Sequence, residues 1–468
     1  MRWRKAHFIG LGGVGMSAVA KLLTDAGVQV TGSDEDIYPP VSDFLARGKF
    51  DVRMPYAAAN IPSDADLIVI GKNARLVKET NEEVAAAYQS GKPVLSFPEV
   101  LAELSNGKEA VVIAGSYGKS TTTALIAHCL EDAGLEPSYF IGAAPLSPDE
   151  NARLGAGALF VMEGDEYPSS NTDPRAKFLH YRPMHLLITP LAHDHFNIFK
   201  TPADYLKPFQ ELVTLPPAQG TVVVCAEGPL SGEFLAGLAR PVVTYGLTTG
   251  DFQAAGIAWG EATRFAITRG EEKVIEIETT QLGEHNVQNI VGAAAFIFSK
   301  NLMTPGRFAA AVRSFKGIRR RLDKKSGKTS VAVFEGFGSS FEKMRAAVAA
   351  MTLHFPARRL FIVFEPNTFS WRMRASLPHY DSVFKGAAKV FIFEPPHDGK
   401  AAELSGEEIA ARVRANGIDA AAAASPESVL EALGRELKAD DAILLSSSGG
   451  MGGLIGSVSA LAEQKFPL

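Results

Sequence analysis

Cysteine is scarce in this chain, and its scarcity excludes two classes of protein. Only Cys129 and Cys225 occur among the 468 residues. Two cysteines cannot build a disulfide framework, and these two lack the paired spacing of a cysteine metal site. This usage favours a reducing compartment.

Basic charge is also in short supply. Lys and Arg total 47 against 52 Asp and Glu, so the formal net charge is −5 (47 − 52). Without a basic excess the protein has little to hold a nucleic-acid backbone, so we expect no DNA or RNA partner. Local lysines, arginines and backbone N–H groups can still bind smaller anions.

Long apolar runs are absent as well. No stretch of about 18 apolar residues occurs, which excludes a membrane-spanning helix. The N-terminal apolar run is short and broken by glycines, unlike the core of a signal peptide. The alanine-rich stretch 419–425 is interpreted as ordinary packing rather than a low-complexity tail. We therefore expect a cytoplasmic protein.

What the chain does contain is a regular alternation of short apolar strands and amphipathic helical patterns, which is typical of parallel α/β domains. At roughly 100–200 residues per domain, the length suggests about three domains. We place their limits at 1–107, 108–316 and 317–468. The segment 252–279 alternates and carries turn residues, which predicts a small antiparallel excursion.

The motif with the clearest chemistry is Gly115-Ser116-Tyr117-Gly118-Lys119-Ser120-Thr121, between a predicted strand and a predicted helix. A full phosphate-binding loop has four residues between its glycines, and this one has two. The glycines let backbone N–H groups face a phosphate, Lys119 can reach the outer phosphates, and the Ser120 hydroxyl can bind Mg²⁺. The alternative is a tight strand-to-helix turn with a solvated lysine.

A second glycine loop, Gly10-Leu11-Gly12-Gly13-Val14-Gly15, follows the first predicted strand. Asp34 comes about twenty residues later, where the ribose-binding acid of a dinucleotide site is expected. By motif alone this loop indicates NAD. Because the chain has another phosphate loop, this one can equally hold a different diphosphate, or merely pack a helix closely on a strand.

Acidic residues and a histidine follow two predicted strands. Glu163-Gly164-Asp165-Glu166 comes after the run LFVM, and Asp194-His195 lies just past the run LLIT. The carboxyl ends of parallel strands form the ligand edge of such a sheet, so these side chains are candidate ligands for a phosphate-bridging cation. Histidine is a poor ligand for Mg²⁺, so His195 can equally be a capped loop residue.

Two further segments carry open alternatives. In GEHNVQN (283–289), Asn286 and Asn289 can read a purine edge, or one of them can simply cap a helix. The run Arg319–Arg321 can neutralise phosphates or form a solvated, charged hinge.

Together these residues resemble the Mur ligases, the ATP-dependent amide-forming enzymes of bacterial peptidoglycan. GSYGKSTTT is similar to the family's G-T-H-G-K-T-T-T, GEHNVQN to its G-x-H-N-x-x-N, and FKGIRRRL (315–322) to its F-x-G-x-x-R-R. The resemblance spans essentially the entire chain. It implies three domains: a Rossmann-like N-terminal domain for a UDP-sugar, a central P-loop ATPase-like domain for ATP, and a Rossmann-like C-terminal domain for the amino substrate.

Within the family, several stretches favour the peptide-adding members that work in murein recycling over those that add L-alanine. These stretches are 31–45, 163–183, 194–199, 364–372 and 447–454. We therefore expect a ligase that joins L-alanyl-γ-D-glutamyl-meso-diaminopimelate, or a variant, to UDP-N-acetylmuramate. The alternatives are a UDP-N-acetylmuramate–L-alanine ligase and a divergent nucleotide-sugar-binding protein with weak or no turnover. A third interpretation, which depends on the glycine loop at 10–15, is a nicotinamide oxidoreductase.

The resemblance also implies roles for individual residues. Lys119, Glu163 and His195 are the implied catalytic residues, and Ser120, Glu163 and His195 the implied Mg²⁺ surroundings. The implied ATP site comprises Gly115, Ser116, Tyr117, Gly118, Lys119, Ser120, Thr121, Asn286, Asn289, Arg321 and Glu335. The implied UDP-sugar site comprises Gly12, Gly13, Val14, Gly15, Ser33 and Asp34. ATP and Mg²⁺ are the expected cofactors, and a monomer or weak homodimer is the expected assembly.

The implied reaction proceeds through an acyl phosphate. ATP phosphorylates the lactyl carboxylate, Lys119 and Mg²⁺ offset the charge on the transferring phosphoryl group, and the amine then attacks. One seven-residue element and three single positions depart from the family pattern. The element D-D-[FY]-A-H-H-P reads Glu335 to Phe341 as EGFGSSF, and Asn367, Ala192 and Tyr117 replace an Arg, a Glu and a His. Glu335 can still accept a ribose hydroxyl, and Ser339 can still donate to a phosphate.

Overall fold

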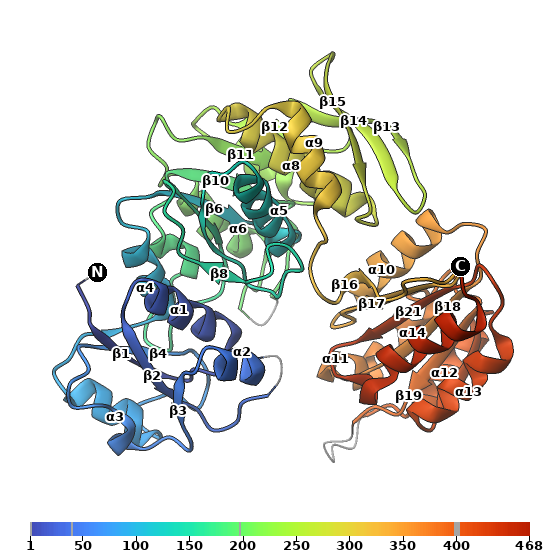
Figure 1. Ribbon diagram of the computed structural model, residues 1–468, viewed down its shortest axis with the longest axis horizontal. Helices are drawn as coiled ribbons and strands as arrows, with labels where there is room; N and C mark the ends of the chain where they lie inside the picture. Colours follow the sequence, from blue (N-terminus) through green and yellow to red (C-terminus); the bar gives the residue numbers. More distant parts are fainter. Residues whose placement is uncertain (1, 39–40, 196–197, 397–402) are drawn as a thin grey trace. The chain divides into compact units, whose positions relative to one another are not determined.

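The computed structural model describes residues 2–38, 41–195, 198–396 and 403–468. The chain forms two compact units, each built from more than one segment (Figure 1). The first comprises Met1–Ala255, Ala266–Ile277 and Gln288–Lys316, and the second comprises Gly256–Phe265, Glu278–Val287 and Gly317–Leu468. Among the described residues, no helix has the length and apolar character needed to cross a membrane.

The first unit begins with a five-stranded parallel sheet in the order β3-β2-β1-β4-β5. Its strands are β1 (Lys5–Ile9), β2 (Gln29–Ser33), β3 (Asp51–Arg53), β4 (Leu67–Ile70) and β5 (Val94–Leu95). Its helices are α1 (Val14–Asp25), α2 (Val41–Arg47), the 3-10 turn η1 (Ala58–Asn60), α3 (Glu82–Gln89) and α4 (Phe97–Leu104). From β1 the chain adds β2 and β3 on one side and then β4 and β5 on the other, so the switch point of the sheet lies between β1 and β4. Open α/β sheets bind their ligands at such a switch point.

The chain continues into a ten-stranded sheet in the order β15-β14-β13-β12-β11-β10-β6-β9-β7-β8. Most of this sheet belongs to the first unit, but parts of β13, β14 and β15 and the start of α8 belong to the second. Its strands are β6 (Glu109–Ala114), β7 (Ser138–Phe140), β8 (Ala152–Arg153), β9 (Leu159–Glu163), β10 (His185–Ile188), β11 (Val222–Cys225), β12 (Val243–Tyr245), β13 (Phe252–Ala258), β14 (Thr263–Arg269) and β15 (Glu272–Thr279). Its helices are α5 (Lys119–Asp132), η2 (Lys177–His180), α6 (Pro202–Leu212), α7 (Ser231–Ala236), α8 (Glu284–Ser299) and α9 (Pro305–Ser314). Strands β10, β6 and β9 are neighbours and parallel, so the loops that follow them meet at one edge.

The second unit contains a six-stranded sheet in the order β16-β17-β21-β18-β19-β20, parallel except for β16. Its strands are β16 (Arg321–Lys324), β17 (Ala332–Gly336), β18 (Leu360–Glu365), β19 (Lys389–Phe393), β20 (Asp419–Ala423) and β21 (Ala442–Ser447). Its helices are α10 (Phe341–His354), α11 (Phe369–Arg372), η3 (Arg374–Asp381), α12 (Gly406–Ala415), α13 (Pro426–Glu436), η4 (Met451–Gly453) and α14 (Leu454–Lys465).

Burial on both faces explains why the central strands are almost continuously apolar. In β18, Leu360, Ile362 and Phe364 face one core, and Phe361 and Val363 face another. Successive strand side chains point to opposite faces, so a strand with helices on both sides needs apolar residues at every position. In the first unit, a single apolar cluster runs from the first sheet into the ten-stranded sheet.

The predicted fold class, three α/β parts each with a largely parallel sheet, is confirmed. The alanine-rich stretch forms strand β20 at the edge of the third sheet. The expected excursion at 252–279 contains the three strands β13, β14 and β15, which lie next to one another at one end of the ten-stranded sheet. The domain limits at 107/108 and 316/317 stay a prediction.

The imidazole of His354 is buried in the second unit. His354, the last residue of α10, donates from Nδ1 to Gly260 O at 2.7 Å and accepts the Gly283 N–H on Nε2 at 2.7 Å. A ring with one donating and one accepting nitrogen is neutral. Burial lowers the pKa of His354.

We expect the second unit to lose stability as the pH falls. The unfolded chain protonates His354 near its ordinary pKa of about 6.5, whereas the folded unit keeps it neutral. Its contribution is therefore complete above about pH 6.5 and is lost progressively as the pH falls below that value.

Chemical denaturation at pH 7.5 and pH 5 tests this expectation. His354→Gln should reduce the dependence of the unfolding free energy on pH, whereas His379→Gln, at an exposed position, should not. An unchanged pH dependence in His354→Gln would show that the acid sensitivity comes from elsewhere.

Candidate active site

The loop Gly115–Gly118 joins β6 to α5, and its two glycines are required by its path. Gly115 has a φ of +130°, and a Cβ there would lie 2.2 Å from Thr189 Oγ1. Gly118 has a φ of +87°, and a Cβ there would lie 2.3 Å from Asn289 Oδ1. Both positions combine a backbone conformation that favours glycine with a close neighbour. The loop therefore packs tightly against Thr189, which follows β10, and against Asn289 of helix α8.

Lys119, the first residue of α5, points back along this loop. Its Nζ donates to Gly115 O at 2.5 Å and contacts Glu166 Oε1 and Oε2 at 3.3 and 3.1 Å. Burial lowers the pKa of Lys119, but the carboxylates of Glu166, Asp165 and Glu163 outweigh it and hold the pKa above its ordinary value. Lys119 therefore carries its positive charge at the loop.

Glu166 is the most enclosed charge at this edge, since its side chain is 0% exposed. Burial raises its pKa, but Lys119 and a hydrogen bond from His195 bring it below its ordinary value. His195 Nε2 lies 3.1 Å and the Tyr205 hydroxyl 3.2 Å from Glu166 Oε1. The Tyr205 hydroxyl also lies 2.8 Å from Ser116 Oγ. Glu166 was expected only as one of the candidate cation ligands after the predicted strand, and Tyr205 was not among the expected site residues.

A second carboxylate, Glu163 at the end of β9, faces the start of α5. Ser120 Oγ donates to Glu163 Oε1 at 2.9 Å, and the Gly142 N–H donates to Glu163 Oε2 at 2.7 Å. The structure thus brings together Ser120 and Glu163 of the expected metal set, whereas His195 faces Glu166. Across the described part of the chain, no group of three or more His, Cys, Asp or Glu side chains is placed to hold a metal ion.

The two predicted asparagines of α8 have different surroundings. Asn289 lies against Gly118 of the phosphate loop, within the first unit. Asn286 belongs to the second unit, where its side chain donates to Leu282 O at 2.8 Å. In that bond the side-chain amide donates to a carbonyl, so it is not the helix cap that the sequence allowed, in which a side-chain oxygen accepts a backbone N–H.

The first glycine loop is held by Asp34. Gly12 N–H donates to Asp34 Oδ2 at 2.6 Å, and the Tyr56 hydroxyl donates to Asp34 Oδ1 at 2.9 Å. Helix α1 begins at Val14, and its N-cap residue is Gly13, which has no side chain to form a capping hydrogen bond. The N-terminus of α1, at Val14 and Gly15, therefore has no side-chain cap. Burial and the charge of Asp34 raise the pKa of Tyr56 far above its ordinary value. Tyr56 was not predicted, because it lies 22 residues from Asp34 in the chain.

Ser33, expected at the UDP-sugar site, lies in a fully buried polar cluster. Its hydroxyl donates to Glu83 Oε1 at 2.7 Å, and His7 Nε2 contacts the same oxygen at 2.7 Å. Ser33 O also accepts the Gly10 and Leu11 N–H groups of the glycine loop. The structure therefore places the Ser33 backbone, rather than its hydroxyl, in contact with the loop.

In the second unit, Glu335 makes ion pairs instead of facing solvent. Arg320 Nε lies 3.1 Å from Glu335 Oε1, and Lys325 Nζ lies 3.0 Å from Oε2. Arg320 also donates to Ser447 O and Gly449 O at 2.7 and 2.6 Å. The arginine that contacts Glu335 is thus Arg320, whereas the expected Arg321 begins β16 beside Gly336.

The altered loop that follows Glu335 has its own internal contacts. Gly338 O accepts the indole N–H of Trp371 at 2.7 Å, and Ser340 caps α10 by accepting the Lys343 N–H. Ser339 Oγ, expected to donate to a phosphate, accepts from Lys343 Nζ at 3.2 Å.

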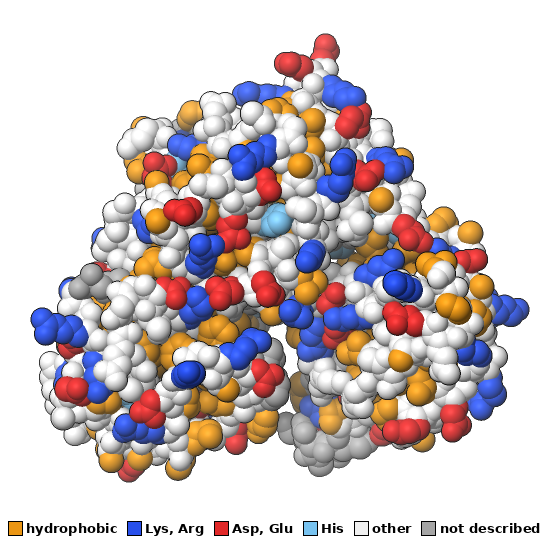
Figure 2. All heavy atoms as spheres, in the orientation of Figure 1, with side chains coloured by type: hydrophobic (Ala, Val, Ile, Leu, Met, Phe, Trp, Pro, Cys, Tyr) orange, Lys and Arg blue, Asp and Glu red, His pale blue; other side chains and the backbone are white. Residues whose placement is uncertain are grey.

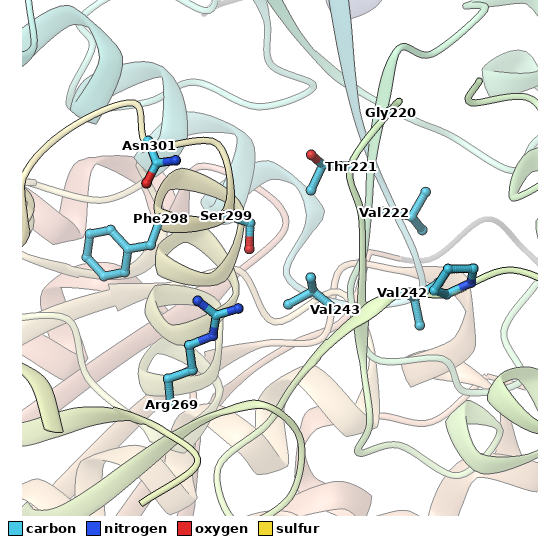
Figure 3. A pocket seen from close by; sticks show the side chains of 10 residues that line it. Gly220, Thr221, Val222, Val242, Val243, Arg269, Phe298, Ser299 and Asn301 are labelled. Atoms are coloured by element: carbon cyan, nitrogen blue, oxygen red, sulfur yellow. The ribbon is translucent and has the colours of Figure 1, made fainter. Parts of the chain in front are cut away.

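A shallow cavity of about 420 Å³ lies away from the phosphate loop, at the amino ends of β11 and β12 (Figure 3). Thr221, Val243, Arg269 and Ser299 are among the residues that line it. Because parallel α/β sheets bind ligands at the carboxyl ends of their strands, this cavity is at the wrong edge for the expected nucleotide. On the face drawn in Figure 2, acidic and basic side chains are interspersed, as a net charge of −5 leads one to expect.

Comparison with known proteins identifies the family. The family model of the Mur ligase catalytic domain matches residues 5–109, and that of the Mur ligase middle domain matches residues 113–297. The UDP-N-acetylmuramate–L-alanine ligase of Halorhodospira halophila is 32% identical, over 97% of this chain and 92% of that protein. Further relatives of the same name, at 30–31% identity, match over 95–99% of their own length.

Solved structures share the fold along the chain. UDP-N-acetylmuramate–alanine ligase from Thermotoga maritima superposes with a TM-score of 0.78 at 21% identity, covering 99% of both chains. A murein peptide ligase from Psychrobacter arcticus has a TM-score of 0.66 at 25% identity, covering 99% of this chain and 100% of that one.

The expectation of a peptide ligase of murein recycling is wrong. It depended on five short stretches, two of which (31–45 and 194–199) include residues 39–40 and 196–197 outside the described ranges. The curated relatives that match over nearly the whole length are instead named L-alanine ligases. The nicotinamide oxidoreductase reading is likewise set aside by the family match at residues 5–109.

The geometry of the phosphate loop and the whole-length similarity lead to the same assignment: the chain belongs to the Mur ligase family and is an ATP-dependent, ADP-forming ligase.

Proposed function

We propose that this enzyme joins L-alanine to the lactyl carboxylate of UDP-N-acetylmuramate. The single observation that carries the chemistry is the position of Lys119 and Ser120 at the start of α5, opposite Glu166, which follows β9, and Glu163, which ends it. The substrates are suggested by the relatives named UDP-N-acetylmuramate–L-alanine ligases, which match over 92–99% of their length.

A carboxylate and an amine do not condense in water, so the carboxylate must first be activated. Transfer of the γ-phosphoryl group of ATP concentrates negative charge on the phosphoryl oxygens. The Lys119 ammonium and the N-terminus of α5, which has no side-chain cap, can offset that charge. The L-alanine amine then displaces phosphate from the acyl phosphate and forms the amide.

Ser120 and Glu163 are suited to hold the Mg²⁺ that accompanies ATP. They offer a hydroxyl and a carboxylate oxygen 2.9 Å apart, and the Gly142 N–H fixes the second carboxylate oxygen. Magnesium at nucleotide sites takes one or two protein oxygens and completes its shell with phosphates and water, so the absence of a larger acidic cluster is no obstacle. The ion would neutralise phosphate charge during the transfer.

We assign the UDP diphosphate to the first glycine loop. The uncapped N-terminus of α1 offers backbone N–H groups and partial positive charge. Asp34 and Tyr56 keep the loop in shape by holding Gly12. The carboxyl ends of β17, β18 and β21 in the second unit, with the reshaped loop at Phe337–Ser340, are our candidate for the amino-acid site.

An assay of ADP and phosphate release tests the function directly. With UDP-N-acetylmuramate, ATP and Mg²⁺, we expect release to depend on L-alanine, and mass spectrometry should detect the UDP-N-acetylmuramoyl-alanine product. Glycine, D-alanine and the tripeptide L-alanyl-γ-D-glutamyl-meso-diaminopimelate serve as comparison acceptors. Release that needs the tripeptide, or no release with any acceptor, would contradict the proposal.

Lys119→Ala should lower turnover by about a hundredfold or more, because a preorganised cation at the phosphoryl group is lost. It also leaves Glu166 without its counter-charge, so a lower melting temperature is expected. Adding Glu166→Gln to this variant should recover the melting temperature but not the turnover. Lys207→Ala, on the exposed side of α6, is the matched control. Full turnover in Lys119→Ala would remove the phosphate role.

Glu163→Gln should raise the Mg²⁺ concentration needed for half-maximal turnover by roughly tenfold or more, since an amide is a weaker ligand than a carboxylate. Turnover should recover at high Mg²⁺, which distinguishes weaker metal binding from a damaged fold. Glu211→Gln, at an exposed position on α6, should titrate like the unmodified enzyme. A Glu163→Gln enzyme with the same Mg²⁺ dependence would move the metal site elsewhere.

A further inference from the structure

In this structure the donors of Lys119 are committed to protein acceptors. Its three N–H groups face Gly115 O at 2.5 Å, both oxygens of Glu166 at 3.1 and 3.3 Å, and more distantly Ser116 O at 3.4 Å. A lysine that binds nucleotide phosphates cannot keep all of these contacts, because an ammonium has three donors. Binding ATP therefore requires Lys119 to release at least one of these contacts, and both contacts with Glu166 are longer than the one with Gly115 O.

That movement exposes an energetic problem at Glu166. Its side chain is fully buried, and a buried carboxylate that loses its counter-charge is strongly destabilised. The remaining groups near Oε1 are His195 Nε2 at 3.1 Å and the Tyr205 hydroxyl at 3.2 Å. A group that stabilises the Glu166 carboxylate after Lys119 has moved away therefore also lowers the free energy needed for Lys119 to bind the nucleotide.

The hydrogen-bond arrangement around Tyr205 has two alternatives. Ser116 Oγ accepts the Ala192 N–H at 2.8 Å and lies 2.7 Å from Ala192 O and 2.8 Å from the Tyr205 hydroxyl. If Ser116 donates to Ala192 O, the Tyr205 proton points to Ser116. If Ser116 instead donates to Tyr205, the Tyr205 proton is free for Glu166. Rotation of two O–H bonds converts one arrangement into the other without moving a heavy atom.

The ring of Tyr205 holds its hydroxyl in place for this exchange. Tyr205 is 0% exposed and lies on α6, with the rings of Phe199 and Phe209 both 5.2 Å away. Burial and the charge of Glu166 hold the pKa of Tyr205 far above its ordinary value, so the hydroxyl keeps its proton.

We propose that Tyr205 is a positioning residue for ATP binding: its hydroxyl turns from Ser116 to Glu166 as Lys119 leaves that carboxylate for the nucleotide phosphates. Tyr205 thus acts through Glu166 and Ser116 and touches neither ATP nor the reacting atoms. The inference rests on the proposed contact between Lys119 and phosphate. The inference goes beyond the phosphate loop, because it makes the affinity for ATP depend on the Tyr205 hydroxyl, which lies outside that loop.

Tyr205→Phe tests the proposal because it removes one oxygen and keeps the ring. Calorimetric titration with ATP and Mg²⁺, without other substrates, should show an affinity roughly tenfold weaker, as expected for a hydrogen bond to a charged group. The melting temperature without nucleotide should change little, because Lys119 then still covers Glu166. Tyr181→Phe is the matched control, since Tyr181 is fully buried and its hydroxyl has no hydrogen-bond partner among the described residues.

A double-mutant cycle separates positioning from a general structural role. In a Glu166→Gln background there is no charge to stabilise, so Tyr205→Phe should cost much less than tenfold in ATP affinity. A purely structural role of the hydroxyl would give the same loss in both backgrounds and would overturn the proposal. So would an unchanged ATP affinity in Tyr205→Phe.

The unmodified enzyme distinguishes this inference from the function on which it rests. If it binds ATP and Lys119→Ala does not, while Tyr205→Phe binds normally, only the role of Tyr205 fails. If Lys119→Ala binds and turns over ATP as the unmodified enzyme does, the proposed phosphate contact fails, and the exchange at Tyr205 fails with it.

Discussion

Glu166 is a fully buried carboxylate, so it needs a counter-charge or hydrogen-bond donors in every state of the enzyme. Lys119 supplies the counter-charge, His195 and Tyr205 supply hydrogen bonds, and Ser116 links Tyr205 to the phosphate loop. These contacts join the loops that follow β6, β9 and β10 at one edge of the ten-stranded sheet. The shape of the nucleotide site is therefore coupled to how one buried negative charge is satisfied.

The sequence predicts well what is local. The phosphate loop was expected from seven consecutive residues, and its glycines are confirmed by positive φ angles at Gly115 and Gly118. The α/β class followed from the spacing of apolar runs. Contacts between distant residues have no such signal: Tyr205 lies 39 residues from Glu166, and Glu83 lies 50 residues from Ser33. Nothing in either local pattern indicates which side chain the other will meet.

Register is the second thing that the sequence does not specify. Three arginines in a row precede Glu335, and the family resemblance suggested the last of them. In the structure Arg320 has a φ of +63°, and the pairing of β16 with β17 shifts between Arg321 and Asp323. Because strand side chains alternate between faces, a one-residue shift decides which arginine reaches the carboxylate. The amino substrate was misjudged for a related reason, since short loop matches weighed more than similarity along the whole chain.

The second unit consists of three separate chain segments, and this limits which fragments of the protein can fold on their own. The chain passes from one unit to the other after Ala255, Phe265, Ile277, Val287 and Lys316. A fragment that begins at residue 317 would contain the whole six-stranded sheet but would lack Gly260 and Gly283, the partners of both nitrogens of His354. In such a fragment the neutral His354 ring would lack both of its hydrogen-bond partners. The C-terminal sheet is therefore continuous in sequence, but the folded unit to which it belongs is not.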